Sequence, residues 1–464
     1  MNRLTRILFV GLMLMWSACS QVANTASRPN IILILADDLG YGDLGCYGQT
    51  HFATPNLDQL AQEGMRFTQH YAGSPVCAPA RCVLMTGKHT GHAFVRGNAQ
   101  NKESFGQLPL PADEITIAKL LQANGYRTGA FGKWGLGNAG SSGDPLQHGF
   151  EQFFGYHDQV RAHNSYPEFL MDGSTKVMLR NEVQYLSDTL WHRGLGSVST
   201  QKVDYSNDLI LEKALDFIDQ DSDRPFFLYF PTTIPHDNGE AEIGQRIEVP
   251  DASKFADRPW PADEKSYAAL VEHLDGYLRR MREKLTESGQ ADNTIIIFTS
   301  DNGPLPSQAL DSNGALQGHK RDLYEGGIRV PLIVHWPGQI TGGESDHISG
   351  FQDFLPTLAE MAGIKDVPAT DGLSFMGTLQ GRGQVAHDYL YWEFHWWKSS
   401  KQAIRQGKWK AIRNGPEAPI ELYDLRQDVG ETTDLASQYP QHIARMDSLM
   451  QEARTSSVHF PMKP

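Results

Sequence analysis

Basic residues are in the minority in this sequence. Lysine and arginine number 41 against 55 aspartate and glutamate residues, which gives a formal net charge of −14. This balance argues against nucleic acid or an anionic membrane surface as a partner. It does not exclude a small anionic ligand, because a local group of cations and a metal can bind one inside an acidic protein.

Long apolar runs are also missing, except at the N-terminus. Arg3 and Arg6 precede an apolar stretch at residues 7–16, which is typical of a secretory signal and too short to span a bilayer. The small residues and Cys19 of "SACS" follow, and they resemble a bacterial lipoprotein processing site. We therefore expect residues 1–19 to be a signal peptide with a lipidated Cys19. The protein is then exported, either lipid-anchored in the cell envelope or, after simple cleavage, free in the periplasm.

Cysteine is scarce as well. The four cysteines are Cys19, Cys46, Cys77 and Cys82. An even number in an exported protein is compatible with disulfide bonds. If Cys19 is lipidated and Cys77 is modified, only Cys46 and Cys82 remain, and the sequence leaves open whether they pair.

Cys77 stands out because of its neighbours. It lies in "GSPVCAPARCVLMTG", between Pro75 and Pro79 and four residues before Arg81. Prolines on both sides predict a turn-like loop, which a modifying enzyme can read as an extended peptide.

Strand and helix patterns alternate along most of the chain, without internal repeats or low-complexity linkers. Strands are expected at residues 31–35, 125–133, 225–235, 295–298 and 328–338, and helices at 113–124, 205–218, 262–287 and 351–362. Continuous β-branched runs indicate strands that are covered on both faces. We therefore predict an α/β fold, in which helices sandwich a large, mostly parallel sheet.

The pattern changes near Gly372. Short strands with a turn at Gly407 and Lys408 follow, and a polar helix is expected at residues 438–454. This pattern predicts a small antiparallel sheet with a C-terminal helix. We therefore divide the mature chain into a main domain, residues 28–375, and a small α+β subdomain, residues 376–464.

Polar side chains follow several of the predicted strands. They are Asp37, Asp38, Lys133, His236, Asp301 and Asn302. A single aspartate after a strand is often a helix cap or a turn residue, but here two strands end in such pairs. In open α/β sheets, ligands bind beyond the carboxyl ends of the strands, and adjacent carboxylates repel one another unless a cation neutralises them. Oxygen ligands without clustered histidine or cysteine favour Ca²⁺ or Mg²⁺ over zinc.

Taken together, these motifs resemble the type I sulfatases of the alkaline phosphatase-like superfamily. "CAPAR" (residues 77–81) matches the cysteine signature of that family, and "FGKWGLG" (131–137) is similar to its second signature. The segments "NIILILADDLG", "FTSDNG" and "GHKRDLYEGGIRVP" also look like family segments. The resemblance covers nearly the whole mature chain.

The resemblance implies that Cys77 is oxidised to formylglycine by a formylglycine-generating or an anaerobic sulfatase-maturating enzyme. The hydrated aldehyde then attacks sulfur. By the same resemblance the metal, usually Ca²⁺ and less often Mg²⁺, is held by Asp37, Asp38, Cys77, Asp301 and Asn302. The resemblance also assigns cationic or acid–base roles to Arg81, Lys133, His236 and Lys320.

One position departs from the family pattern. Many members have a histidine in the second signature where this chain has Gly135. Another residue must then transfer the proton, and the candidates are His163 and His236. We expect His163 to have a catalytic, substrate-facing role.

The aromatic segment "WEFHWWKSSKQ" (residues 392–402) suggests a sugar-binding surface, because aromatic faces pack against sugar rings and lysine can bind sulfate. We predict that His395, Trp396 and Trp397 contact substrate, whereas Trp392 packs in the sheet. The expected substrate is a sulfated polysaccharide or oligosaccharide, such as a sulfated galactan or a glycosaminoglycan fragment.

Three alternatives are open at this point. The same superfamily contains phosphatases and phosphonate monoester hydrolases. An unmodified Cys77 would leave a non-catalytic glycan-binding lipoprotein. Cys77 would otherwise act as a thiol or form a disulfide bond, with Cys82 nearby in the sequence.

Overall fold

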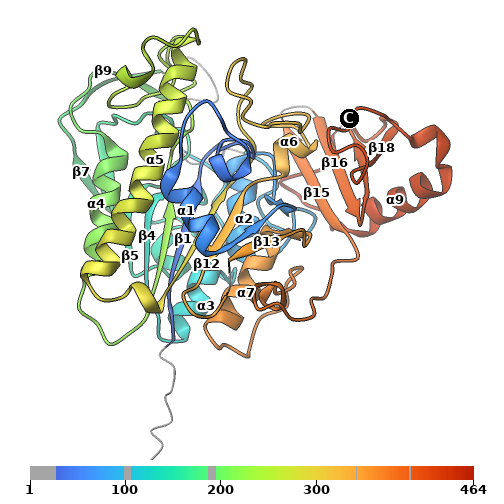
Figure 1. Ribbon diagram of the computed structural model, residues 1–464, viewed down its shortest axis with the longest axis horizontal. Helices are drawn as coiled ribbons and strands as arrows, with labels where there is room; N and C mark the ends of the chain where they lie inside the picture. Colours follow the sequence, from blue (N-terminus) through green and yellow to red (C-terminus); the bar gives the residue numbers. More distant parts are fainter. Residues whose placement is uncertain (1–27, 99–105, 187–194, 341, 397–398, 464) are drawn as a thin grey trace, which may run out of the picture.

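A ten-stranded sheet forms the centre of the molecule (Figure 1). The computed structural model describes residues 28–98, 106–186, 195–340, 342–396 and 399–463. The strand order is β13-β2-β12-β11-β1-β10-β4-β5-β6-β7. The strands are β1 (Asn30–Ala36), β2 (Met65–Phe67), β4 (Arg127–Lys133), β5 (Gln152–Tyr156), β6 (Phe169–Asp172), β7 (Thr175–Met178), β10 (Phe226–Pro231), β11 (Thr294–Ser300), β12 (Leu332–His335) and β13 (Gly343–Ser345).

The centre of this sheet is parallel, and antiparallel strands flank it. β1 lies parallel to β10 and β11, and β4 lies parallel to β10 and β5. On one side β12 runs antiparallel to β11 and β2, and on the other β6 runs antiparallel to β5 and β7. The predicted mostly parallel sheet is therefore confirmed, with the segment that contains β12 as an antiparallel exception.

Helices cover both faces of the sheet, as predicted (Figure 1). Successive side chains of a strand point to opposite faces. Ile32 and Ile34 of β1 accordingly pack with α1 (Pro55–Glu63), α4 (Ser206–Asp219) and α5 (Ala262–Glu287). Ile31, Leu33 and Leu35 pack with α2 (Cys77–Thr86), α3 (Ile117–Ala123) and α7 (Phe354–Met361). Both cores are therefore anchored on the same central strand.

The helix predicted at residues 113–124 is shorter than expected. α3 begins only at Ile117, because the Thr116 side chain caps it by accepting the backbone N–H of Lys119 over 3.1 Å. The helix predicted at residues 262–287 agrees with α5 at both ends.

The remaining elements of the main part are short. They are β3 (His70–Tyr71), β8 (Glu182–Tyr185), β9 (Ser197–Gln201), β14 (Ser349–Gly350), α6 (Glu325–Ile328), α8 (Met376–Leu379) and the 3-10 turns η1 (Gly45–Tyr47), η2 (Pro145–His148), η3 (Arg161–His163), η4 (Ser253–Phe255), η5 (Ala291–Asn293) and η6 (Phe351–Asp353).

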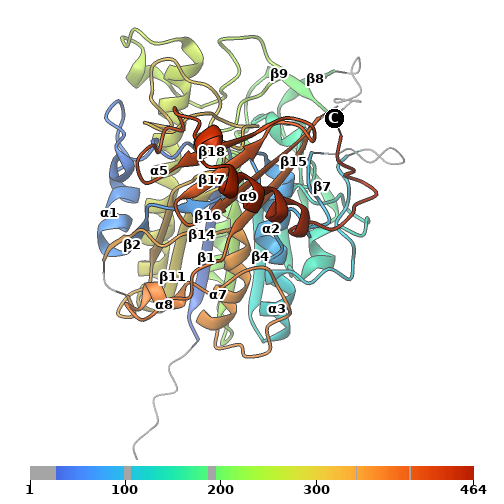
Figure 2. The same ribbon diagram turned by 90° about the vertical axis from the view of Figure 1, so that its right-hand side faces the viewer.

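A four-stranded antiparallel sheet follows near the C-terminus, as predicted (Figure 2). It consists of β15 (Leu390–Trp396), β16 (Ser399–Gln406), β17 (Trp409–Arg413) and β18 (Ile420–Asp424), and η7 (Ala436–Gln438) and α9 (Pro440–Glu452) come after it. α9 covers the outer face through Met446 and Leu449. The inner face packs on Tyr71, Val76 and Ile328 of the main part. The small sheet therefore packs against Val76, the residue directly before Cys77.

Within the described residues, no helix is long and apolar enough to cross a membrane. The signal peptide predicted at residues 1–19 and the lipidation site at Cys19 lie outside the described residues.

Candidate active site

Two neighbouring strands bring the predicted oxygen ligands together. β1 ends directly before Asp37 and Asp38, and β11 ends directly before Asp301 and Asn302. Ala36 is paired with Ser300 at the ends of these parallel strands, so both pairs emerge at the same edge. The backbone N–H of Asp38, which has a left-handed φ of 64°, donates to Oδ1 of Asp301 over 3.2 Å. All four side chains are buried.

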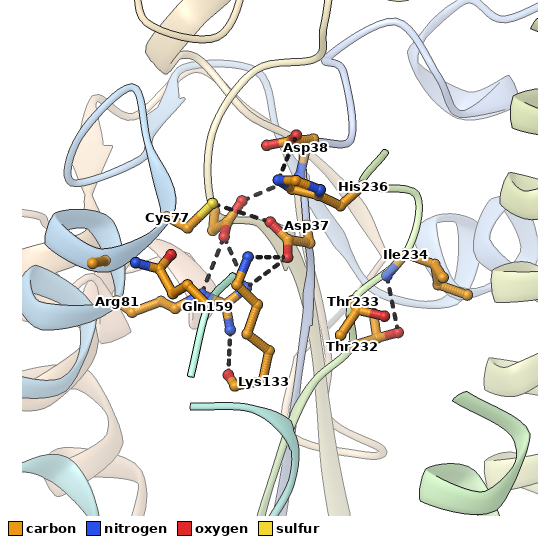
Figure 3. A network of polar contacts seen from close by, with 12 residues as sticks. Asp37, Asp38, Cys77, Arg81, Lys133, Gln159, Thr232, Thr233, Ile234 and His236 are labelled. Carbon is orange, nitrogen blue, oxygen red and sulfur yellow. Dashed lines mark hydrogen bonds and ion pairs between the residues drawn. The ribbon is translucent and has the colours of Figure 1, made fainter. Parts of the chain in front are cut away.

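Cys77 lies beside this group, but the loop predicted around it is wrong. Cys77 is the first residue of α2, after the extended Val76. Pro79 occupies the first turn of that helix, where a missing backbone N–H costs no hydrogen bond. Figure 3 shows the Cys77 side chain turned toward Asp37, and Sγ lies 3.3 Å from the Asp37 Oδ1 atom. The thiol is buried, with only 2% of the residue exposed.

Three cations balance the carboxylates. The Lys133 Nζ, at the end of β4, donates to Asp37 Oδ2 over 2.7 Å (Figure 3). Arg81 lies one helical turn after Cys77 and donates to Asp301 Oδ2 from its NH2 nitrogen over 2.8 Å and from Nε over 3.2 Å. The third cation, Lys320, donates from Nζ to Asp38 Oδ2 over 2.6 Å.

The pKa values of these groups reflect the crowding. Burial would raise the pKa of Asp37, but Lys133, His236 and Arg81 outweigh it and hold that pKa well below its usual range. Burial and the nearby Asp37 raise the pKa of Asp301 to about 7. Burial and Asp37 also raise the pKa of the Cys77 thiol. The three cations match the three carboxylates in number, but burial still opposes ionisation of Asp301, and the unmodified thiol is protonated.

One orphaned atom tests whether a metal ion fits here. The Asn302 amide Nδ2 donates to Asp38 Oδ1 over 2.7 Å, whereas its Oδ1 is buried and has no hydrogen-bond partner in the described part of the chain. Ligand atoms of Asp37, Asp38, Cys77 and His236 all lie within 4.8 Å of one another. A buried amide oxygen without a partner beside crowded carboxylates is the donor set that a hard divalent cation prefers. The residues present therefore fit such an ion.

His236 is tied up by two partners. Its Nδ1 lies 2.6 Å from the backbone oxygen of Asp237, and its Nε2 lies 2.8 Å from Nζ of Lys320. Burial and the Lys320 charge lower the pKa of His236 well below its usual value. The neutral ring therefore donates through Nδ1 to the carbonyl oxygen and accepts at Nε2 from the lysine.

A cavity of about 570 Å³ opens over this cluster. Asp38, Cys77, His236 and Lys320 all line it, so four of the predicted residues face a common space. Arg81 and Lys133 are buried beneath them and are not among the lining residues.

Of the described residues that were expected to contact substrate, two line the cavity and one does not. His163 and Trp396 both line the cavity. His395 does not, because its ring is buried: Nε2 contacts Glu393 at 2.9 Å and Nδ1 contacts Ser400 Oγ at 2.9 Å. Its alternating position in β15 points it away from the cavity that Trp396 reaches. Trp397 lies outside the described residues.

Sequence reasoning missed two residues beside Gly135. This glycine has a left-handed φ of 79°, and a Cβ built there would lie 3.2 Å from Gln159 Cγ. Gln159 Nε2 donates to Asn98 Oδ1 over 3.5 Å, and both side chains line the cavity next to Cys77. Figure 3 shows Gln159 close to Arg81. No motif marks Gln159 or Asn98, because only the fold carries their loops to the site.

Among the described residues, Cys46 and Cys82 do not form the disulfide bond that the sequence left open. Cys46 is partly exposed and Cys82 is buried in α2, and both are free thiols. Trp392 is buried in β15, as predicted, and its indole N–H donates to the backbone oxygen of Ala72 over 2.9 Å.

Comparison with known proteins gives consistent matches. The family model Sulfatase matches residues 29–364, and the model N-sulphoglucosamine sulphohydrolase, C-terminal, matches residues 318–456. Arylsulfatase A of Homo sapiens is 32% identical over 453 residues, which cover 88% of this chain and 84% of that protein. N-acetylgalactosamine-6-sulfatase of Homo sapiens is 29% identical, with 94% and 87% covered. The crystal structure of Ps i-CgsB in complex with k-i-k-neocarrahexaose has a TM-score of 0.74 and 27% identity, with 92% of both chains covered.

Proposed function

This chain belongs to the sulfatase family and is a sulfuric ester hydrolase, and we propose that it removes sulfate from a sulfated polysaccharide or oligosaccharide. We also propose that Cys77 acts after oxidation to formylglycine and that the bound metal is Ca²⁺. The observation that supports this mechanism best is the convergence of Cys77, three carboxylates and three cations at one edge of the sheet.

Two groups would complete the site. A hydrated formylglycine at position 77 supplies two hydroxyl groups on one carbon, one to attack sulfur and one to release sulfate afterwards. Asp37, Asp38, Asp301, Asn302 and the modified Cys77 would hold Ca²⁺, which would supply positive charge to offset that of the sulfate group.

The side chains of the protein divide the remaining work. Of the three cations in the cluster, Lys320 is the one that lines the cavity, where it can stabilise charge that develops on the sulfate oxygens. Arg81 and Lys133 lie beneath and hold the carboxylates in place through direct ion pairs. Arg81 also donates to the backbone oxygen of Lys133 over 2.5 Å, which ties α2 to the end of β4. These contacts preorganise the site before substrate arrives.

Burial of Cys77 bears on the partner that would modify it. Only 2% of the residue is exposed, and its backbone is helical. A maturation enzyme therefore has to act on the chain before α2 forms. We propose that a formylglycine-generating or an anaerobic sulfatase-maturating enzyme modifies Cys77 in the unfolded chain, before export to the periplasm or the lipid-anchored state at the cell envelope.

The cavity supports a glycan substrate. Its volume of about 570 Å³ lies in the range of small-ligand sites. Trp396 lines it, and the guanidinium of Arg321 lies 5.1 Å from the Trp396 ring centroid. An indole beside a cation suits a sugar ring that carries a second anionic group, such as a neighbouring sulfate or carboxylate. Sulfated galactans and glycosaminoglycan fragments both have this chemistry.

The decisive experiment combines mass spectrometry with sulfate release. We expect the peptide that contains Cys77, from protein purified from its native host, to have the mass of formylglycine. We expect that protein to release sulfate from sulfated oligosaccharides, and a Cys77→Ala variant to release none. Cys82→Ala is the matched control, because it removes a buried thiol from the same helix but not from the site. A plain thiol at position 77, or faster hydrolysis of matched phosphate esters, would overturn the proposal.

A further inference from the structure

Desulfation of a sugar requires a proton donor for the leaving oxygen, because a sugar alkoxide is a poor leaving group. Gly135 has no side chain to supply one. The donor therefore has to come from another residue that lines the cavity.

His236 is unsuited to that task. Its Nδ1 faces the backbone oxygen of Asp237, and its Nε2 faces the ammonium group of Lys320. Neither ring nitrogen is left to face a substrate. Lys320 itself is held by His236 and by Asp38 Oδ2, at 2.8 Å and 2.6 Å. These contacts hold the His236 and Lys320 side chains in place, where they can bind the negative charge of a sulfate group.

His163 has the opposite arrangement. It belongs to η3, lines the cavity and stacks on His236, with ring centroids 4.8 Å apart and planes inclined by 13°. Its Nδ1 lies 3.0 and 3.1 Å from the two carboxylate oxygens of Glu240. The Glu240 side chain is almost fully buried, at 1% exposure, whereas that of His163 is 15% exposed. Its Nε2 forms no hydrogen bond with the described part of the chain.

We propose that His163 is the general acid for the leaving alcohol and that Glu240 is the residue that positions it. The Glu240 carboxylate accepts the Nδ1 proton, which orients the ring and leaves Nε2 as the nitrogen that faces the cavity. This inference rests on the proposed function, because it assigns a role within the same sulfate ester cleavage.

The step is balanced when the nucleophile is included. A hydroxyl oxygen of the hydrated formylglycine at position 77 would form the new bond to sulfur and lose its proton to solvent, while the S–O bond to the alcohol would break. The electron pair of that bond goes to the alcohol oxygen, and the proton on Nε2 of the His163 imidazolium moves to that oxygen. The alcohol departs neutral, and His163 is left as neutral imidazole with its Nδ1 proton still donated to Glu240. Solvent returns the proton to Nε2 before the next turnover.

Other charged groups surround the pair. Asp158 and Arg161 lie near His163 on its own segment, His236 stacks on it from the segment after β10, and Asp237 lies beside His236. Glu240 is the one whose carboxylate contacts the ring directly. Removal of Glu240 should therefore affect the same chemical step as removal of His163.

The test uses mature enzyme and a series of phenyl sulfates with progressively poorer leaving groups: 4-nitrophenyl, phenyl and 4-methoxyphenyl sulfate. A phenol that is a good leaving group departs with little help from a proton donor, whereas a poor leaving group depends strongly on protonation. In His163→Gln we expect kcat to fall about 100-fold on the poorest ester and only several-fold on 4-nitrophenyl sulfate, in keeping with the usual size of general acid catalysis. His163→Phe retains a stacked ring without a proton and should show the same trend.

Glu240 is tested in parallel. Glu240→Gln should show the same steepened dependence on the leaving group with a smaller loss, and Glu240→Asp should restore part of it. His273→Gln is the matched control, because His273 also pairs with a carboxylate, Asp208, at 2.8 Å but does not line the cavity. It should follow the wild-type series.

The outcomes separate the two proposals. An equal loss across the series in both His163 variants, or no loss, would overturn the acid role and leave a structural one. A wild-type enzyme that hydrolyses none of these esters and no sulfated oligosaccharide would instead overturn the proposed function.

Discussion

Lys320 donates to Nε2 of His236 over 2.8 Å and to Oδ2 of Asp38 over 2.6 Å. The two partners follow different strands, β10 and β1, which lie side by side in the sheet. Burial would lower the pKa of Lys320, but Asp38 outweighs it and keeps the ammonium charged. One cation therefore joins the carboxylate that follows β1 to the histidine that follows β10.

Removal of this cation should slow catalysis. We expect Lys320→Ala to lower kcat/KM for sulfate release by about 100- to 1,000-fold, because one preorganised charge contact in an active site has about this value. Lys265→Ala is the control, because its Nζ donates to the backbone oxygen of Ala256 and Lys265 does not line the cavity. A loss of less than about threefold in Lys320→Ala would contradict the assigned role.

Metal binding should be measurable as stability, independently of activity. We expect Ca²⁺ to raise the Tm of the wild type and a chelator to lower it. A ligand at 100 times its Kd contributes about 2.7 kcal/mol to the free energy of unfolding. Asn302→Ala removes the orphaned oxygen and should abolish most of the Ca²⁺ response. Asn414→Ala, an exposed position outside the site, should keep the full response. An Asn302→Ala variant with the wild-type Ca²⁺ response would refute this ligand assignment.

A buried charge network behind the site should make stability depend on pH. Lys410 Nζ lies 2.9 Å from carboxylate oxygens of both Glu325 and Glu431. Burial, with repulsion from Glu325, raises the pKa of Glu431 to about 7 from an ordinary 4.5. Burial alone would raise the pKa of Glu325. The charges of Lys410 and Arg329 outweigh burial and hold that pKa at about 2.

The two glutamates therefore act in opposite directions. The folded state binds more protons at Glu431 than the unfolded chain does between about pH 4.5 and 7, so this group costs stability as the pH rises through that window. Glu431→Gln should remove the cost, and its Tm relative to the wild type should rise from about pH 5 to pH 7. The exposed Glu417→Gln should show no such trend. A constant Tm difference for Glu431→Gln would show that the group does not titrate in this range.

Loss of Glu325 should be harmful instead. Its stabilising contribution is complete above about pH 4.5 and is lost as the pH falls toward 2. Glu325→Gln breaks a buried ion pair, and we expect a cost of about 3–5 kcal/mol at neutral pH, measured by denaturant unfolding. A change within about 1 kcal/mol would mean that the network contributes little.

Trp396 should matter more for large substrates than for small ones. We expect Trp396→Ala to raise KM for sulfated oligosaccharides about tenfold, in line with the loss of one aromatic contact, and to raise KM for 4-nitrophenyl sulfate much less. Trp409→Ala is the control, because Trp409 lies in the same sheet but contacts His442, with ring centroids 4.7 Å apart, and does not line the cavity. Equal effects of the two variants on KM would argue against a sugar-binding role for Trp396.

Local patterns in the sequence were sufficient for much of the framework. The β-branched runs of β1 and β11 predict buried central strands, and the polar residues that follow them predict a ligand site at the sheet edge. The periodic pattern of residues 262–287 predicts α5 to the residue. The predictions of β1, β11 and α5 succeed because burial on both faces of a strand, or on one face of a helix, leaves a direct record in the order of the side chains.

Other features depend on contacts between distant segments. Pro75 and Pro79 suggest a loop, yet Cys77 begins a helix, because packing of α2 on the sheet outweighs the local signal and the helix tolerates proline in its first turn. His395 looked like a substrate contact from its aromatic neighbours, but the register of β15 turns it inward.

The sequence by itself therefore determined the sheet, the family signatures and the chemical types gathered at the strand ends, because each is written in neighbouring residues. Only the tertiary structure decided which side chains share the cavity. Glu240 meets His163 from 77 positions away, and Gln159 meets Gly135 through a loop that no motif marks. Chain folding sets such distances, and no local pattern along the sequence encodes them.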